Sequence, residues 1–135
     1  MRERWDLDAI RAGAMVALVF AVPFSIGGRI VADDDGDSTL LVWLNLAAVL
    51  GFVLGAGCAA WVQRKGTPLS HGLVTAIGTY LAAQVVFVLI RLIRGDDVSL
   101  FAILFNLTIV LGAGLLGGFL GSRLQRQGIR PRGRP

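Results

Sequence analysis

Residue types that could catalyse a reaction or hold a metal ion are few in this sequence. It has one histidine, His71, and one cysteine, Cys58, so neither a histidine–cysteine metal site nor a nucleophile–histidine set at plausible spacing can form. The glycine clusters follow no strand, which excludes phosphate-binding loops. We expect His71 to be an interfacial residue beside Pro68 and Cys58 to be a small packing residue. The sequence therefore predicts no enzyme, no cofactor and no catalytic or metal site.

Two acidic clusters could chelate a divalent cation or serve as solvated loop caps that pair with nearby arginines. Arg29, Arg91 and Arg94 lie near these clusters in the sequence. Their positive charges favour the interpretation as loop caps. The clusters contain Asp33, Asp34, Asp35, Asp37, Asp96 and Asp97.

Four neutral polar residues interrupt long apolar stretches, about five to seven residues from one end of each: Ser25, Asn45, Gln84 and Asn106. At about 1.5 Å per helical residue they share a depth of about 8–10 Å. If they face inward, they form a polar layer capped by arginines. A hydrogen-bonded staple between helices is the favoured interpretation, at about 0.6 kcal/mol per bond. A binding site, a narrow polar pore and a lipid-facing position remain alternatives.

The elements that position these residues are four continuous apolar stretches at 10–31, 40–62, 69–93 and 100–120. A bilayer core requires about 20 apolar residues in a helix. The stretches do not alternate as strands do, and only 16% of residues are charged, against about 25% in soluble proteins. We predict an all-α polytopic four-helix bundle, one integral membrane domain over 1–135. A cleaved signal peptide is an alternative for the first stretch, but its acidic flank and its length favour a retained span.

Arginine and lysine in short loops predict the orientation. Ten of the 13 basic residues lie in the N-terminal segment, the second loop and the C-terminal tail, and three lie on the other side. Both termini are therefore expected in the cytoplasm. Twelve of the 13 are arginine, which is typical of a GC-rich bacterial source, so we expect a bacterial inner (plasma) membrane.

An internal repeat with an offset of 61–62 residues relates the two halves of the chain. Seven of the thirteen residues at 45–57 recur at an offset of 61. Apolar matches arise by chance, but polar ones rarely do. The period of two spans predicts two tandem hairpins related by a pseudo-twofold axis along the membrane normal. The polar matches are Asn45 with Asn106, Arg29 with Arg91, Asp34-Asp35 with Asp96-Asp97, and Gln63-Arg64 with Gln125-Arg126.

Small residues spaced for close helix packing lie in the cytoplasmic halves of the second and fourth spans. In lipid such residues let helix backbones approach closely. Packing within the chain is the favoured interpretation, and a homodimer seam is the alternative. The residues are Gly51, Gly55, Gly114, Gly117, Gly118 and Gly121.

The segment 121–135 is expected to be an extended basic tail without an acidic residue. It should lie on anionic lipid headgroups of the inner leaflet, at about 1 kcal/mol per basic residue. It lacks aromatic residues for base stacking, so nucleic acid is not an expected partner. Its basic residues are Arg123, Arg126, Arg130, Arg132 and Arg134.

The chain resembles small bacterial four-helix membrane proteins of unknown function of the DUF3792 type. The resemblance rests on the glycine-rich second span, the short basic loop leading to His71-Gly72, and the motif at 116–121. It implies the architecture and no catalytic residue. We expect a structural or accessory component that acts through helix–helix association with itself or another membrane protein. A small oligomeric channel or transporter that uses the polar layer is the alternative.

Overall fold

The structure is a computed structural model that describes residues 5–33 and 38–129. Within these ranges the chain forms four α-helices and no strand. All four are long and apolar enough to cross a membrane. The prediction of an all-α four-helix fold is confirmed. The helices are α1 (Leu7–Asp33), α2 (Ser38–Val62), α3 (Pro68–Arg94) and α4 (Leu100–Arg126).

The helices are mostly longer than the apolar stretches, because residues outside the stretches cap their ends. Asp6 Oδ1 accepts a hydrogen bond from the backbone N–H of Ala9 at 3.2 Å, at the start of α1. Ser99 Oγ accepts one from Ala102 at 3.2 Å, at the start of α4. Both bonds satisfy a donor that a helix N-terminus otherwise leaves unpaired. Helix α3 ends at Arg94, and the next residue, Gly95, has a φ of 75°, the left-handed conformation that favours glycine.

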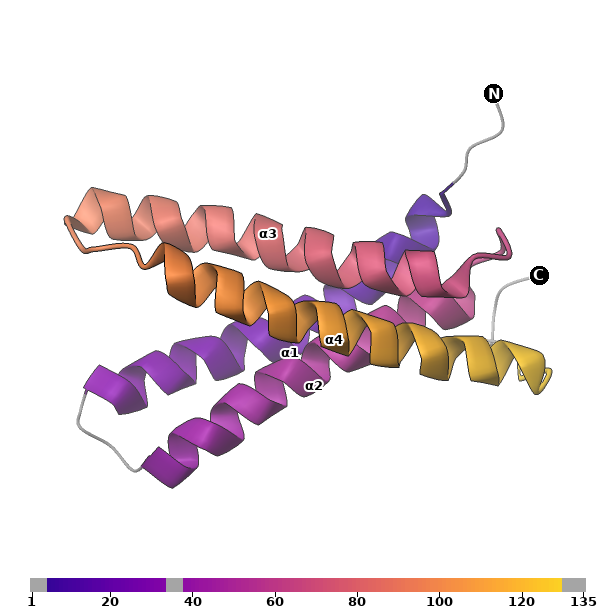
Figure 1. Ribbon diagram of the computed structural model, residues 1–135, viewed down its shortest axis with the longest axis horizontal. Helices are drawn as coiled ribbons and strands as arrows, with labels where there is room; N and C mark the ends of the chain where they lie inside the picture. The colour runs from indigo at the N-terminus through magenta and orange to yellow at the C-terminus, as the bar shows by residue number, and fades with distance from the viewer. Residues whose placement is uncertain (1–4, 34–37, 130–135) are drawn as a thin grey trace.

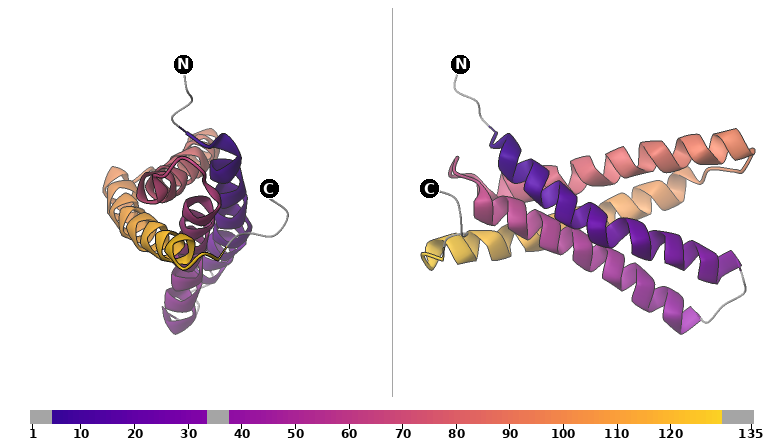
Figure 2. Two further views of the ribbon diagram at one scale, coloured as in Figure 1. Left: turned by 90° about the vertical axis from the view of Figure 1, so that its right-hand side faces the viewer. Right: turned by 180° about the vertical axis from the view of Figure 1, so that it is seen from behind.

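The helices form two hairpins, α1–α2 and α3–α4, which cross one another (Figure 1). Helices α2 and α3 each contact the other three, whereas the backbones of α1 and α4 do not approach each other closely within the described ranges. The hairpins lie together at the end with the α2–α3 connection and diverge toward the other two connections (Figures 1 and 2). We call the diverging end the outer end, following the orientation that the sequence predicts. The inner and outer ends of the bundle therefore pack differently.

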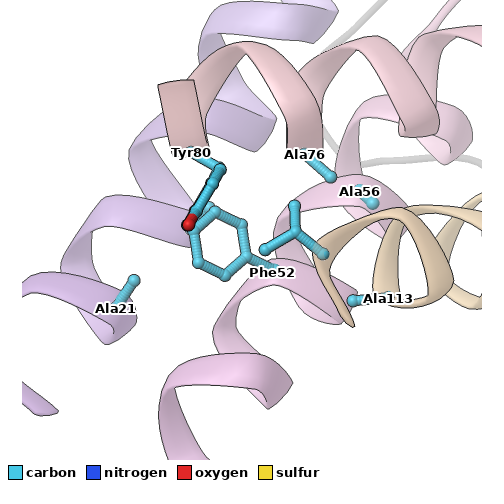
Figure 3. Packing of buried hydrophobic residues seen from close by; sticks show 8 residues of the cluster. Ala21, Phe52, Ala56, Ala76, Tyr80 and Ala113 are labelled. Carbon is cyan, nitrogen blue, oxygen red and sulfur yellow. The ribbon is translucent and has the colours of Figure 1, made fainter. Parts of the chain in front are cut away.

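Small residues fill the centre, where all four helices meet (Figure 3). The buried cluster contains five alanines together with Phe52, Tyr80 and Val110. The rings of Phe52 and Tyr80 meet edge to face, with centroids 6.2 Å apart. Toward the inner end glycines bring the backbones closer still: a Cβ added at Gly72 would lie 2.8 Å from Gly118 Cα. The inner half of the fold is therefore closed by close backbone contact.

Large apolar side chains cover the outside of the helices. Ile93 is 85% exposed, Phe101 79% and Leu50 53%. In water a continuous surface of this kind would drive association, whereas in a bilayer lipid tails solvate it. Small residues inside and large apolar residues outside are the arrangement expected of a membrane-spanning bundle.

Candidate functional site

The structure brings the four neutral polar residues around one space. Ser25, Asn45, Gln84 and Asn106 come one from each helix and line a single cavity of about 510 Å³ between the diverging hairpins. Ligand pockets have volumes of about 300–1,000 Å³. Each residue lies in the outer half of its helix. Because the four side chains share this depth, they can line one cavity. A cavity with a polar residue from each helix is therefore built from residues that are far apart in the sequence.

The deep end of the cavity is apolar and continuous with the core. Phe52, Ile109 and Val110 line it there, and Phe52 and Val110 belong to the buried cluster. Tyr80 also lines it, but its hydroxyl donates to the carbonyl oxygen of Ile103 at 2.8 Å. This bond joins α3 to α4 and fixes the tyrosine ring at the cavity wall.

The polar residues do not form the staple that the sequence favours. Asn45 Nδ2 donates to the carbonyl oxygen of Leu41 on its own helix, at 2.9 Å. Within the described residues no hydrogen bond joins one of the four side chains to another. Asn45 and Asn106 are both exposed, while Ser25 and Gln84 are partly buried. Amide groups therefore face the cavity with hydrogen-bonding capacity left for a bound group.

Two arginines lie at the outer rim of the site. Arg29 and Arg91 line a smaller space of about 110 Å³, and Gln84 and Asn106 line both this space and the main cavity. The Arg29 guanidinium lies over the Phe87 ring, with Cζ 5.4 Å from the centroid. The arginines thus stand above the amides, on the outer side of the polar layer.

All six glycines expected to pack helices face another helix of the same chain. Gly51 and Gly55 face α1, Gly114 and Gly118 face α3, and Gly117 and Gly121 face α2. A Cβ added at Gly121 would lie 2.7 Å from Ala60 Cβ and 2.5 Å from the Gly57 oxygen. These faces are used inside the fold and are not available as a homodimer seam.

A second polar cluster, which sequence reasoning missed, lies at the inner end. His71, expected as an interfacial residue beside Pro68, is 0% exposed and lies inside the bundle near the start of α3. Its Nε2 accepts a hydrogen bond from the backbone N–H of Asp6 at 2.9 Å, and its Nδ1 lies 2.8 Å from the carbonyl oxygen of Thr67. These partners require the tautomer with the proton on Nδ1. The Trp5 ring packs against it, with centroids 5.2 Å apart. The cluster ties the start of α1 to the start of α3.

The basic tail begins later than expected. Residues 121–126 continue α4, and Gly121 and Ser122 are buried rather than part of an extended tail. Small residues at these positions let the helix continue along α2. Arg126 Nη2 donates to Ser122 Oγ at 3.2 Å. Arg130, Arg132 and Arg134 lie outside the described residues.

The described residues contain no group of three or more histidine, cysteine or acidic side chains that could hold a metal ion. In the second outer loop Asp96 Oδ2 lies 3.9 Å from Arg94 Nε, and both side chains are exposed. This loop cap agrees with the favoured interpretation of the acidic residues. Asp34, Asp35 and Asp37 of the first cluster lie outside the described residues.

Fold and surface together define an integral membrane protein with four membrane-spanning helices. No family model, no curated protein and no solved structure matches the chain. The resemblance to the DUF3792 type stays a prediction. The functional argument therefore rests on the geometry of the cavity.

Proposed function

We propose that the protein is a non-enzymatic accessory protein of a bacterial inner membrane and acts by binding within the membrane through its outer cavity. One observation carries this proposal: polar side chains from four helices converge on one cavity and do not bond to each other. Unused hydrogen-bonding capacity is costly in lipid, so a group that hydrogen-bonds to these amides would be stabilised there. The glycine faces are used inside the chain, and the outer cavity is the site that we propose for association.

The proposed orientation places both termini in the cytoplasm. It is supported by the ten basic residues on that side, which include Arg123 and Arg126 in the last turn of α4. The partners that we propose are the bilayer itself, anionic headgroups at the cytoplasmic face, and a second copy or another membrane protein.

Replacing two amides separates a binding site from a staple. In the double variant Asn45→Leu/Asn106→Leu we expect a melting temperature in detergent equal to or above that of the wild type. The reason is that both amides are exposed and neither bonds to another helix within the described residues. Thr108→Val is the control, because Thr108 Oγ1 also bonds only to its own helix, to the Leu104 oxygen at 3.1 Å. A clear fall in melting temperature for the double variant alone would assign the residues to stability instead.

A small transporter is a second candidate. It is favoured by the combination of an open outer cavity with an inner half closed by backbone packing, as at Gly72 and Gly118. Alternating access requires one side of a central site to be closed while the other is open. Proton, sodium or potassium flux into proteoliposomes that disappears in the Asn45→Leu/Asn106→Leu variant would establish this candidate. We expect no such flux.

A further inference from the structure

We propose that the outer cavity binds an anionic phospholipid of the outer leaflet. Its phosphate would lie beside Arg29 and Arg91, its glycerol-ester region among the amides, and part of one acyl chain against the apolar deep end. The inference rests on the proposed binding function and names the class of ligand for the same site.

The rim carries the charge that an anionic headgroup needs. Arg29 comes from α1 and Arg91 from α3, so the two hairpins each contribute one cation to the same small space. Guanidinium groups bind phosphate through charge-assisted, often bidentate hydrogen bonds. Arg94, one turn from Arg91, lies near Asp96 and does not line this space. Arg29 and Arg91 are therefore the arginines that line the space at the rim.

The middle of the site matches the ester region of a lipid. Gln84 and Asn106 line both spaces, so the rim and the main cavity are adjacent. Their amide N–H groups can donate to phosphate or ester oxygens, which only accept hydrogen bonds. A lipid would therefore satisfy donors that the four helices leave unused.

The deep end matches an acyl chain. Ala48, Val49, Phe52, Ile109 and Val110 line it and present no polar side chain. From the outer end to mid-depth the wall thus changes from cationic to neutral polar to apolar. A phospholipid in the outer leaflet changes in the same order along the same direction, so it can enter sideways from the bilayer without reorienting.

A second copy of the chain is a poorer occupant. A symmetric dimer formed through this cavity would place the same surface of each copy opposite itself. The rim arginines of the two copies would then approach each other, and like charges disfavour such a contact. The charge of the rim favours an anionic occupant instead.

Native mass spectrometry of the full chain tests the headgroup. Phosphatidylglycerol and phosphatidylcholine with identical acyl chains are added separately to the protein in detergent. We expect one phosphatidylglycerol to be retained, and Arg91→Gln to weaken its binding about tenfold, as for loss of one charged hydrogen bond. Arg94→Gln is the matched control, because it removes the same charge from the same helix end. The basic tail is intact in both variants, so its contribution is constant.

A second pair of variants tests the acyl chain. Ala48→Leu fills part of the cavity and should weaken phosphatidylglycerol binding, whereas Ala82→Leu adds the same side chain at an exposed position away from the cavity. Equal retention of both lipids, or equal effects of Arg91→Gln and Arg94→Gln, would overturn the lipid assignment. The proposed binding function fails separately, through a fall in melting temperature of the Asn45→Leu/Asn106→Leu variant.

Discussion

Gln63 and Gln125 join the inner ends of α2 and α4 through their side chains. Gln63 Nε2 donates to Gln125 Oε1 at 3.1 Å. Gln125 Nε2 donates in turn to the carbonyl oxygens of Trp61 at 2.9 Å and Gln63 at 2.8 Å. The two glutamines are equivalent in the repeat, and equivalent residues near a twofold axis meet in this way. Helix α3 contacts α2, however, while α4 does not contact α1 in the described ranges. The internal repeat therefore stays a prediction.

The Gln125→Leu variant should unfold more easily. Gln125 is the side-chain partner of Gln63, which is 2% exposed, and of two carbonyl groups at the end of α2. Leaving such groups unsatisfied costs about 1–3 kcal/mol. Unfolding in mixed detergent measures the loss, and Gln127→Leu at an exposed position is the control. An equal effect of the two substitutions would show that the glutamine pair adds no stability.

The Gly117→Ala variant should also be destabilised. A Cβ there would meet the Val53 oxygen and lie 2.8 Å from Gly57 N. Both are backbone atoms of α2, which cannot move without disturbing the helix. Overpacking of this kind costs about 1–3 kcal/mol. Gly112→Ala is the matched control on the same helix, because no described atom lies within 4 Å of its added Cβ. It should be neutral or stabilising by up to about 1 kcal/mol. Equal melting temperatures for the two variants would contradict the tight α2–α4 packing.

The His71→Ala variant should release the start of α1. The buried ring accepts from Asp6 N and donates to the Thr67 oxygen, so its loss leaves a space and an unpaired N–H. Hydrogen–deuterium exchange over residues 6–10 should become faster, with little change in the outer halves of the helices. Ser70→Ala, at an exposed neighbouring position, is the control. Unchanged exchange in His71→Ala would mean that the N-terminal segment is held by other contacts.

Features set by local sequence were predictable, and those set by long-range contacts were not. The apolar stretches indicate all four helices, and the shared depth of Asn45 and Asn106 indicates that they can meet. The pairing of His71 with Asp6 spans 65 residues, and no local pattern marks it. Asp6 immediately before α1 is a residue type typical of helix N-caps, a signal that could have placed the start of that helix earlier. The divergence of the hairpins could not be predicted, because it depends on how closely the glycines let the inner halves approach.

Access of water to the cavity tests the central claim most directly. Two single-cysteine variants are made in a Cys58→Ala background. One replaces Asn106, which lines the cavity. The other replaces Leu104, which is 53% exposed on the same helix but does not line the cavity. Both variants are placed in phosphatidylcholine nanodiscs and treated with a charged maleimide, which reacts with hydrated thiolate. The proposed cavity predicts that Asn106→Cys is labelled at least about tenfold faster than Leu104→Cys. Equally slow labelling of the two cysteines would contradict an open polar cavity between the hairpins.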